Sequence, residues 1–373
     1  MRREPRVPFV DLGPVTVPLR DEIVADFTDL LERGAFVNGP EVAEFEDQFA
    51  LYCGTRQCVG TASGLDALRL GLLAAGIEPG DEVIVPANTF VATFEAVEQA
   101  GGIPVAVDVS EADYNLDVSL AGSAVTARTR FILPVHLYGQ LADMRAVGEL
   151  AAARGLRVVE DACQAHGAER DGIRAGTAGL AAGFSFYPAK NLGAVGDAGA
   201  LVTGDDEVAD KARALREHGE VEKYRSLYVG YTARLDTLQA IVLSHKLPLL
   251  DAWNAQRTQV AERYTAALNG VGDLRLPPRP AGSTPVWHLY VVRTADPEAL
   301  RGFLAQDGVS TGRHYPEPAH LSGAFGRLGG GRGSFPVAEA LADELVSLPI
   351  YPGISEEQIE IVTDSVRRFF AGG

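Results

Sequence analysis

Residues 131–161 read FILPVHLYGQLADMRAVGELAAARGLRVVED, and this stretch indicates the class of fold. Two apolar segments in it, Phe131–Val135 and Leu156–Val159, are typical of buried strands, and Met144–Arg154 between them has a helical pattern. Two strands joined through a helix form a parallel pair, because parallel strands need a long crossover connection. We therefore expect an α/β protein with a large, mainly parallel sheet covered by helices.

The same alternation of strands and helices extends toward the N-terminus. Upstream of it, an N-terminal arm precedes a predicted helix at Leu19–Arg33. A helix is expected to begin near Ser63, and Asn88 with Thr89 could cap another that runs through Ala100. The expected strands are Val59–Thr61, Glu82–Pro86 and Ile103–Val107.

The pattern changes after about residue 205, where helical segments dominate. One long helical stretch, Leu235–Leu268, should be kinked at Pro248. The remaining expected elements are helices at Asp205–Glu217, Pro297–Gln306 and Ser355–Phe370 and a strand at Val286–Val292. We predict a large α/β domain over residues 1–245, which includes the N-terminal arm and helix, and a smaller C-terminal α+β domain over residues 246–373.

Composition and charge exclude several classes of function. The 373 residues carry a net charge of −17, and a field of that sign repels nucleic acid and anionic membranes. No apolar run approaches the roughly 18–20 residues that a membrane-spanning helix needs. The three cysteines, Cys53, Cys58 and Cys163, are sparse and form no CxxC motif, which suits a reducing compartment. We therefore expect a cytoplasmic protein with no nucleic-acid or membrane partner. The histidines show no metal-binding spacing, so no metal site is expected.

Residues 60–68, GTASGLDAL, lead from a strand through a turn of small residues into a helix. The N-terminus of a helix offers unpaired N–H groups and a positive dipole end, so it can hold a phosphate. Small side chains such as Ala62 let the phosphate approach the backbone, and the Ser63 hydroxyl can add a hydrogen bond. The alternative is an ordinary helix start with a serine cap.

Aromatic and acidic residues follow two other predicted strands. In Pro86-Ala87-Asn88-Thr89-Phe90, the Phe90 ring could stack on a planar ligand, or it could belong to the core. In residues 158–167, VVEDACQAHG, Glu160 and Asp161 end a buried strand and should point to opposite faces of the sheet. A carboxylate there, for which we choose Asp161, could pair with a protonated pyridine nitrogen, with Gln164 nearby. A metal or magnesium-phosphate site, or a helix cap, is the alternative.

Residues 183–193, GFSFYPAKNLG, place Lys190 in a loop constrained by proline and glycine. A lysine amine held near neutrality among apolar neighbours can form a Schiff base with an aldehyde, whereas a solvated amine stays protonated. Ser185 could donate to a phosphate of the same ligand. The other lysines, Lys211, Lys223 and Lys246, lie in helical or polar stretches and fit solvated surface amines better. Taken together, the four segments fit one ligand, pyridoxal 5′-phosphate (PLP).

The sequence resembles the DegT/DnrJ/EryC1/StrS aminotransferases, a sugar-aminotransferase branch of the PLP-dependent transferase type I fold. The likeness runs from Val7-Pro8-Phe9-Val10-Asp11-Leu12 to Leu348-Pro349-Ile350-Tyr351-Pro352. It includes Pro134–Gln140, Glu160–Gly167, Ser185–Gly193 and Arg234–Ala240.

The resemblance implies a role for each of these cofactor residues. Lys190 would be the catalytic lysine that binds the PLP aldehyde and later moves protons, and Asp161 would face the pyridine nitrogen. Phe90 would stack on the ring, and Gln164 would face its 3′ oxygen. The phosphate would be held by Ala62, Ser63 and Ser185 and, from the partner subunit of a homodimer, by Thr232, which stands where relatives usually have Asn.

The resemblance also implies the reaction. An amino donor, Glu or Gln, would aminate the cofactor to its pyridoxamine form (PMP), which would then transfer the amine to a nucleotide-linked keto-deoxysugar in antibiotic biosynthesis. A dTDP-3-keto-6-deoxyhexose aminated at C3 is our choice, and amination at C4 is the alternative. The sugar nucleotide would lie near His218, Lys223, Tyr224, His314 and Tyr315. A non-catalytic PLP-binding regulatory protein is a more remote alternative. A related sugar dehydratase is another, but it would carry histidine at position 190.

Overall fold

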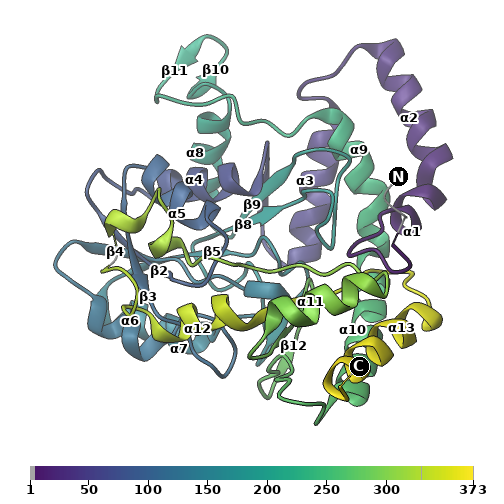
Figure 1. Ribbon diagram of the computed structural model, residues 1–373. Coiled ribbons are helices and arrows are strands. Elements are labelled where there is room, and N and C mark those ends of the chain that lie inside the picture. The colour runs from purple at the N-terminus through teal and green to yellow at the C-terminus, as the bar shows by residue number, and fades with distance from the viewer. Residues whose placement is uncertain (1–4, 329, 373) are drawn as a thin grey trace.

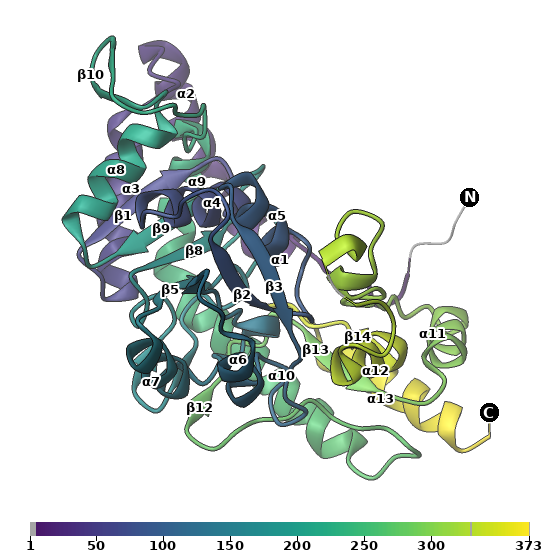
Figure 2. The same ribbon diagram turned by 90° about the vertical axis from the view of Figure 1, so that its left-hand side faces the viewer.

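The structure is a computed structural model that describes residues 5–328 and 330–372. Its centre is a seven-stranded sheet in which β9 runs antiparallel to the other six strands (Figures 1 and 2). In spatial order the strands are β1 (Gln57–Thr61), β9 (Gly199–Thr203), β8 (Ala181–Ser185), β5 (Arg157–Asp161), β4 (Thr129–Ile132), β2 (Glu82–Pro86) and β3 (Ile103–Val107). The expected mainly parallel sheet is thus confirmed.

Helices cover both faces of this sheet because alternate strand residues are apolar on each side. In β5, Val158 packs in the cluster that contains Phe49, whereas Val159 packs in the cluster that contains Phe94. On the first face lie α3 (Pro40–Cys53), α7 (Met144–Arg154) and α9 (Thr237–Lys246). On the second face lie α4 (Gly64–Ala74), α5 (Ala92–Gln99) and α8 (Asp206–Arg216).

The C-terminal part of the chain forms its own apolar cluster around a two-stranded antiparallel sheet, β13 (Tyr290–Arg293) and β14 (Leu345–Leu348). Three helices surround it: α10 (Leu250–Leu268), α11 (Pro297–Gln306) and α13 (Glu356–Phe370). Val7 of the N-terminal arm joins the same cluster and pairs with Val309. The domain boundary at residue 245 stays a prediction.

The remaining elements are short or lie at the periphery. Near the N-terminus, α2 (Arg20–Arg33) follows α1 (Gly13–Thr16), and both stand apart from the central sheet in Figure 1. A small hairpin, β10 (Glu220–Glu222) and β11 (Arg225–Ser226), projects at the top of the same view. The other elements are α6 (Val118–Ala124), α12 (Pro336–Glu344), β6 (Glu169–Arg170), β7 (Ile173–Arg174) and β12 (Ser283–Thr284). None of the helices described is long and apolar enough to span a bilayer.

One predicted helix cap was wrong. Helix α5 begins at Ala92 and has Val91 at its N-cap without a side-chain hydrogen bond, so Asn88 and Thr89 do not cap it. Both residues are buried instead, and the Thr89 hydroxyl lies 2.7 Å from that of Thr93. The predicted kink at Pro248 is confirmed as a 3₁₀ turn, Leu247–Leu249, which separates α9 from α10.

Candidate active site

A pocket of about 460 Å³ lies at the C-terminal ends of the parallel strands. Ser63 follows β1, Thr89 follows β2, Asp161 ends β5 and Ser185 ends β8, and all four line the pocket. This edge is where open α/β sheets bind ligands. Lys190 lines the same pocket from the loop that joins β8 to β9.

The loop around Lys190 is held by hydrogen bonds on its C-terminal side. The Asn191 amide donates to Asn254 Oδ1 and to the Val286 carbonyl, both at 2.8 Å. Asn191 Oδ1 lies 3.1 Å from His288 Nδ1. Burial lowers the pKa of the Lys190 amine, and the nearby Asp161 carboxylate only partly opposes that shift. The loop thus presents an amine that is more readily uncharged than a surface lysine.

Gly193 closes this loop, and an added Cβ there would lie 2.2 Å from the Pro188 carbonyl oxygen. Gly193→Ala should therefore open the loop, lower stability by about 1–3 kcal/mol and weaken cofactor retention. Thermal denaturation and the visible absorbance of the purified protein measure the two effects. Gly204→Ala is the control, because a Cβ at Gly204 meets nothing within 4 Å. Equal behaviour of the two variants would contradict the prediction.

Lys246 differs from the expectation of a solvated amine. Its side chain is buried, and its Nζ donates to the Gly193 carbonyl at 2.9 Å and to Thr16 Oγ1 at 3.1 Å. Burial lowers its pKa to about 8. The sequence pattern missed this burial because the contacts come from the N-terminal arm and the Lys190 loop, which are distant along the chain. Lys246 does not line the pocket, so it acts as a link between these segments.

The two carboxylates at the end of β5 have separate surroundings. Glu160 is fully buried beside His136, with 2.8 Å between Glu160 Oε2 and His136 Nε2, and it accepts backbone N–H bonds from Gly176 and Gly179. These partners lower the pKa of Glu160 against the effect of burial. Asp161 instead lines the pocket. Glu160 thus makes hydrogen bonds inside the protein, whereas Asp161 faces the pocket and can contact a ligand.

Asp161 is oriented by two donors, one of which sequence reasoning missed. The Thr93 hydroxyl donates to Asp161 Oδ2 at 2.8 Å, and the Cys163 N–H donates to Oδ1 at 3.2 Å. Thr93 lies on α5, across the sheet edge from Asp161. No local pattern marks Thr93, because its role comes from the contact with Asp161, 68 residues further along the chain.

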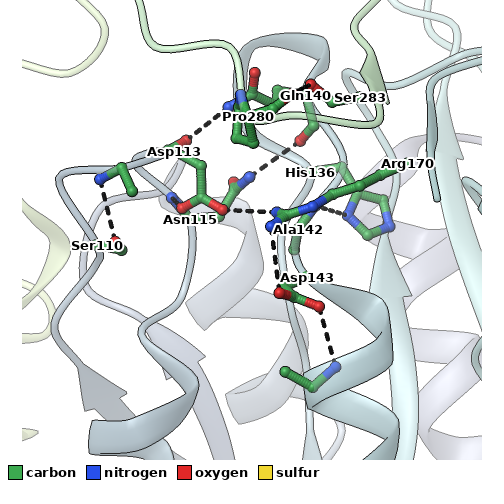
Figure 3. A network of polar contacts seen from close by, with 12 residues as sticks. Ser110, Asp113, Asn115, His136, Gln140, Ala142, Asp143, Arg170, Pro280 and Ser283 are labelled. Carbon is green, nitrogen blue, oxygen red and sulfur yellow. Dashed lines mark hydrogen bonds and ion pairs between the residues drawn. The ribbon is translucent and has the colours of Figure 1, made fainter.

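Gln164 is held in place by a neighbouring turn of the same polypeptide. Its Oε1 accepts from the Tyr138 N–H at 2.7 Å, and its Nε2 donates to the Tyr315 hydroxyl at 3.0 Å. Asn115 secures the turn, because its Oδ1 accepts from the Leu137 N–H. Its Nδ2 also donates to the Gln140 carbonyl (Figure 3). In the same network Arg170 joins Asp113 to Asp143. By holding the turn, these contacts thus fix the position of the Gln164 side chain.

The N-terminus of α4 forms a tight cradle beside Lys190. Ser63 is its N-cap and accepts from the Asp66 N–H at 3.1 Å. A Cβ at Gly64 would lie 2.7 Å from Ser185 Cβ, and one at Gly199 would lie 2.3 Å from the Ser63 carbonyl carbon. Glycine is thus required for these backbones to approach so closely. Ala62 precedes the cradle, and its N–H donates to the Ala233 carbonyl.

Aromatic rings form the wall of the pocket opposite this cradle. Phe90 is half exposed, with its ring centroid 5.4 Å from that of Tyr315. His314 stacks on Phe9 of the N-terminal arm at 5.5 Å. All four residues line the pocket, so the structure brings together Phe90, His314 and Tyr315 with the cofactor residues. Phe9 was not predicted as a site residue, because nothing in the arm's sequence shows that it folds back onto residue 314.

Ala62, although predicted to hold the phosphate, is not among the residues that line the pocket, and four other predicted residues do not reach the pocket of their own chain. His218 and Thr232 lie at the base of the β10–β11 hairpin, with 3.3 Å between His218 Nε2 and Thr232 Oγ1. Lys223 and Tyr224 lie in the hairpin's turn, where Tyr224 is 85% exposed. None of the four is among the residues that line the pocket.

The pocket's donor set fits PLP. It offers an amine of lowered pKa, a carboxylate held by two donors and, at the N-terminus of an eleven-residue helix, two serine hydroxyls. An aldehyde, a ring nitrogen and a phosphate each find a complementary group here. The cradle around Gly64 and Gly199 leaves no room for side chains that would block the phosphate.

Comparison with known proteins agrees with this geometry. The model of the DegT/DnrJ/EryC1/StrS aminotransferase family matches residues 18–367. The chain belongs to this family. A Streptomyces venezuelae relative, dTDP-3-amino-3,4,6-trideoxy-alpha-D-glucose transaminase, is 47% identical, and the match covers 98% of this chain and 96% of the relative. The family assignment confirms the type I fold and makes the chain a PLP-dependent aminotransferase.

Two solved structures show the likeness in three dimensions. The crystal structure of S. venezuelae DesV is 47% identical, has a TM-score of 0.96, and the match covers 98% of this chain and 99% of DesV. The structure of NtdA from Bacillus subtilis, solved with bound PMP, is 32% identical with a TM-score of 0.92 and covers 99% and 86% of the two chains. The likeness to these two structures thus extends over at least 98% of the chain.

Proposed function

We propose that this aminotransferase moves an amino group from glutamate or glutamine to C3 of a dTDP-linked 3-keto-6-deoxyhexose, in amino-sugar and antibiotic biosynthesis. The observation that carries the reaction class is the placement of Lys190 and Asp161 in one pocket beside the cradle of α4. The substrate class is supported by the name of the S. venezuelae relative, whose product bears its amine at C3.

The chain's residues divide the chemical work. When bound, PLP supplies an aldehyde and a protonated ring that stabilises negative charge during proton removal. Asp161 would direct its charge at the ring nitrogen, because Thr93 and the Cys163 N–H fix both its oxygens. Lys190, with its lowered pKa, would accept a proton from the α-carbon of the donor and return it to the adjacent carbon of the cofactor. Ser63 and Ser185 would hold the phosphate, and Phe90 would pack on the ring.

Product analysis tests the substrate. The purified enzyme is incubated with glutamate and either a dTDP-3-keto- or a dTDP-4-keto-6-deoxyhexose, and the products are examined by NMR. We expect a new amine on C3 of the first substrate. Amination of only the 4-keto sugar would transfer the proposal to C4, and no amination of either sugar with glutamate or glutamine would overturn it.

We also propose that the enzyme is a homodimer in which each pocket is completed by the partner's hairpin region. Exposed apolar residues occur on α2, just after it, in the turn of the hairpin and in the segment that follows the hairpin: Val24, Leu31, Phe36, Tyr224, Leu227 and Val229. Val229 is 92% exposed, and a set of such residues is typical of a protein–protein contact. The same region carries Thr232, His218 and Lys223, which do not reach their own chain's pocket. A second copy of the chain would cover the apolar face and deliver these polar residues.

Val229→Asp should therefore split the dimer, because it places a charge in a buried apolar contact. Light scattering should show the wild type at twice the chain mass and the variant shifted toward the single-chain mass. Leu120→Asp is the matched control, because Leu120 is also exposed and its helix, α6, lies far from the hairpin in Figure 1. A monomeric wild type, or a Val229→Asp protein of unchanged mass, would refute the proposed interface.

For localisation, we propose that the enzyme works in the cytoplasm. Cys53, Cys58 and Cys163 are all free thiols, and Cys53 and Cys58 are buried. Burial raises the pKa of each thiol, which keeps it in the unreactive protonated form. A reducing compartment suits this set.

A further inference from the structure

A buried arginine, Arg257, forms part of the pocket wall without a counter-ion. It lies on α10, is only 4% exposed, and lines the same pocket as Lys190 and Asp161. Its Nη1 donates to the Ile350 carbonyl at 2.9 Å and, at longer range, to the carbonyls of Trp287 and His288. Its Nε is enclosed and has no acceptor within the described residues.

No carboxylate pairs with Arg257 in the part of the chain that the structure describes. Arg293, the other buried arginine there, forms an ion pair with Glu344 at 2.9 Å. Burial without such a partner lowers the pKa of Arg257 to about 10. An unpaired buried charge is unfavourable, and it is usually retained only where an anion joins it. In a chain of net charge −17, the missing partner points to a ligand.

The groups around Arg257 also favour the binding of an anion. Burial lowers the pKa of His288, and positive charge on Lys190 and Arg257 lowers it further, as do His166 and His314. The two carboxylates that line the pocket are Asp161, which is engaged by Thr93 and the Cys163 N–H, and Asp197, which is exposed. This side of the pocket therefore has more basic than acidic groups.

Three anionic groups bind to such an enzyme, and they differ in where each must lie relative to the reacting carbon. The cofactor phosphate has its own cradle at the N-terminus of α4. The diphosphate of a sugar nucleotide is separated from the reacting carbon by the sugar ring. The α-carboxylate of the amino donor is bonded directly to the carbon that Lys190 must reach, so it needs a cation within the same pocket.

We propose that Arg257 binds the α-carboxylate of the amino donor. The inference rests on the proposed function, because it requires an α-amino acid as donor. It assigns Arg257 to the first half-reaction alone, since the keto sugar presents an uncharged carbonyl at the same place. Charge-assisted pairing with the part of the guanidinium group that borders the pocket would fix the orientation of the donor.

Matched ligands test this without altering the protein. Isothermal titration of the holoenzyme compares glutamine, an amide at the side chain, with isoglutamine, an amide at the α-carboxyl group. Loss of the α-carboxylate should weaken isoglutamine by about 10- to 100-fold relative to glutamine. Equal affinity of the two amides would overturn the proposal. If the wild type bound and reacted with neither glutamate nor glutamine, the proposed donor itself would be wrong.

Variants of Arg257 then test whether this side chain is responsible for the binding of the α-carboxylate. Arg257→Gln should weaken 2-methylglutamate, which keeps the α-carboxylate but has no proton to lose, by about 10- to 100-fold. Arg257→Lys should recover part of the loss, and the affinity for dTDP and for PLP should stay unchanged. Arg293→Gln is the control, because it removes an equally buried arginine outside the pocket. Equal losses of donor, dTDP and PLP binding would show a merely structural role, and unchanged donor binding would also contradict the inference.

Discussion

Lys190→Ala protein should lose transamination by a factor of about 10³ or more, because one substitution removes both the group that binds the cofactor and the base that moves the proton. The half-reaction with glutamate, followed by 2-oxoglutarate release, measures the loss. Lys211→Ala should retain activity, since Lys211 lies on α8 away from the pocket.

Borohydride reduction followed by peptide mapping adds a direct readout. The cofactor should be trapped on the peptide that contains Lys190, and no trapping is expected in Lys190→Ala. Lys246 makes the experiment decisive, because burial also lowers its pKa, to about 8. A label on Lys246, or full turnover by Lys190→Ala, would refute the assignment of the catalytic amine.

Asp161→Asn should lower kcat by about 10²–10³ while the protein still folds. Asparagine keeps the volume, its Oδ1 can accept from the Cys163 N–H, and the Thr93 hydroxyl can turn to accept from its Nδ2, so the main change is the loss of negative charge. Without that charge the ring nitrogen loses its proton, and the ring no longer stabilises the developing carbanion. Steady-state kinetics and circular dichroism measure the two properties.

The neighbouring carboxylate supplies the comparison for Asp161. Glu160→Gln should chiefly lower stability, because Glu160 pairs with buried His136 and accepts three backbone N–H bonds. A Glu160→Gln protein that folds normally but has no activity, beside an active Asp161→Asn protein, would show that the two carboxylates have been exchanged in their roles.

Local sequence pattern predicted much of the fold. Strands β2 and β3 and helices α7 and α11 have the predicted bounds, because their apolar periodicity and end signals agree. Strand β9 and its antiparallel direction were not predicted, since the five residues Gly199–Thr203 carry no local signal of the direction in which they run. The direction follows from the short loop that carries Lys190 back across the sheet edge.

The site was predicted less evenly. Lys190 and Asp161 could be chosen because each follows a strand in an unusual local setting. Thr93, Phe9, Lys246 and Arg257 could not, because their importance comes from contacts with segments far away in sequence. Arg257 lies in a helix with ordinary polar neighbours, and only packing against Trp287 and Ile350 encloses it.

The pairing of Val7 with Val309 has a bearing on how the enzyme is made. Phe9 reaches His314, and Ile350 completes the same wall of the pocket. Residues 7–9 must therefore meet residues beyond position 308 before this wall can close. A chain that ends before position 309 would hold the strands and Lys190 without an enclosed place for the coenzyme.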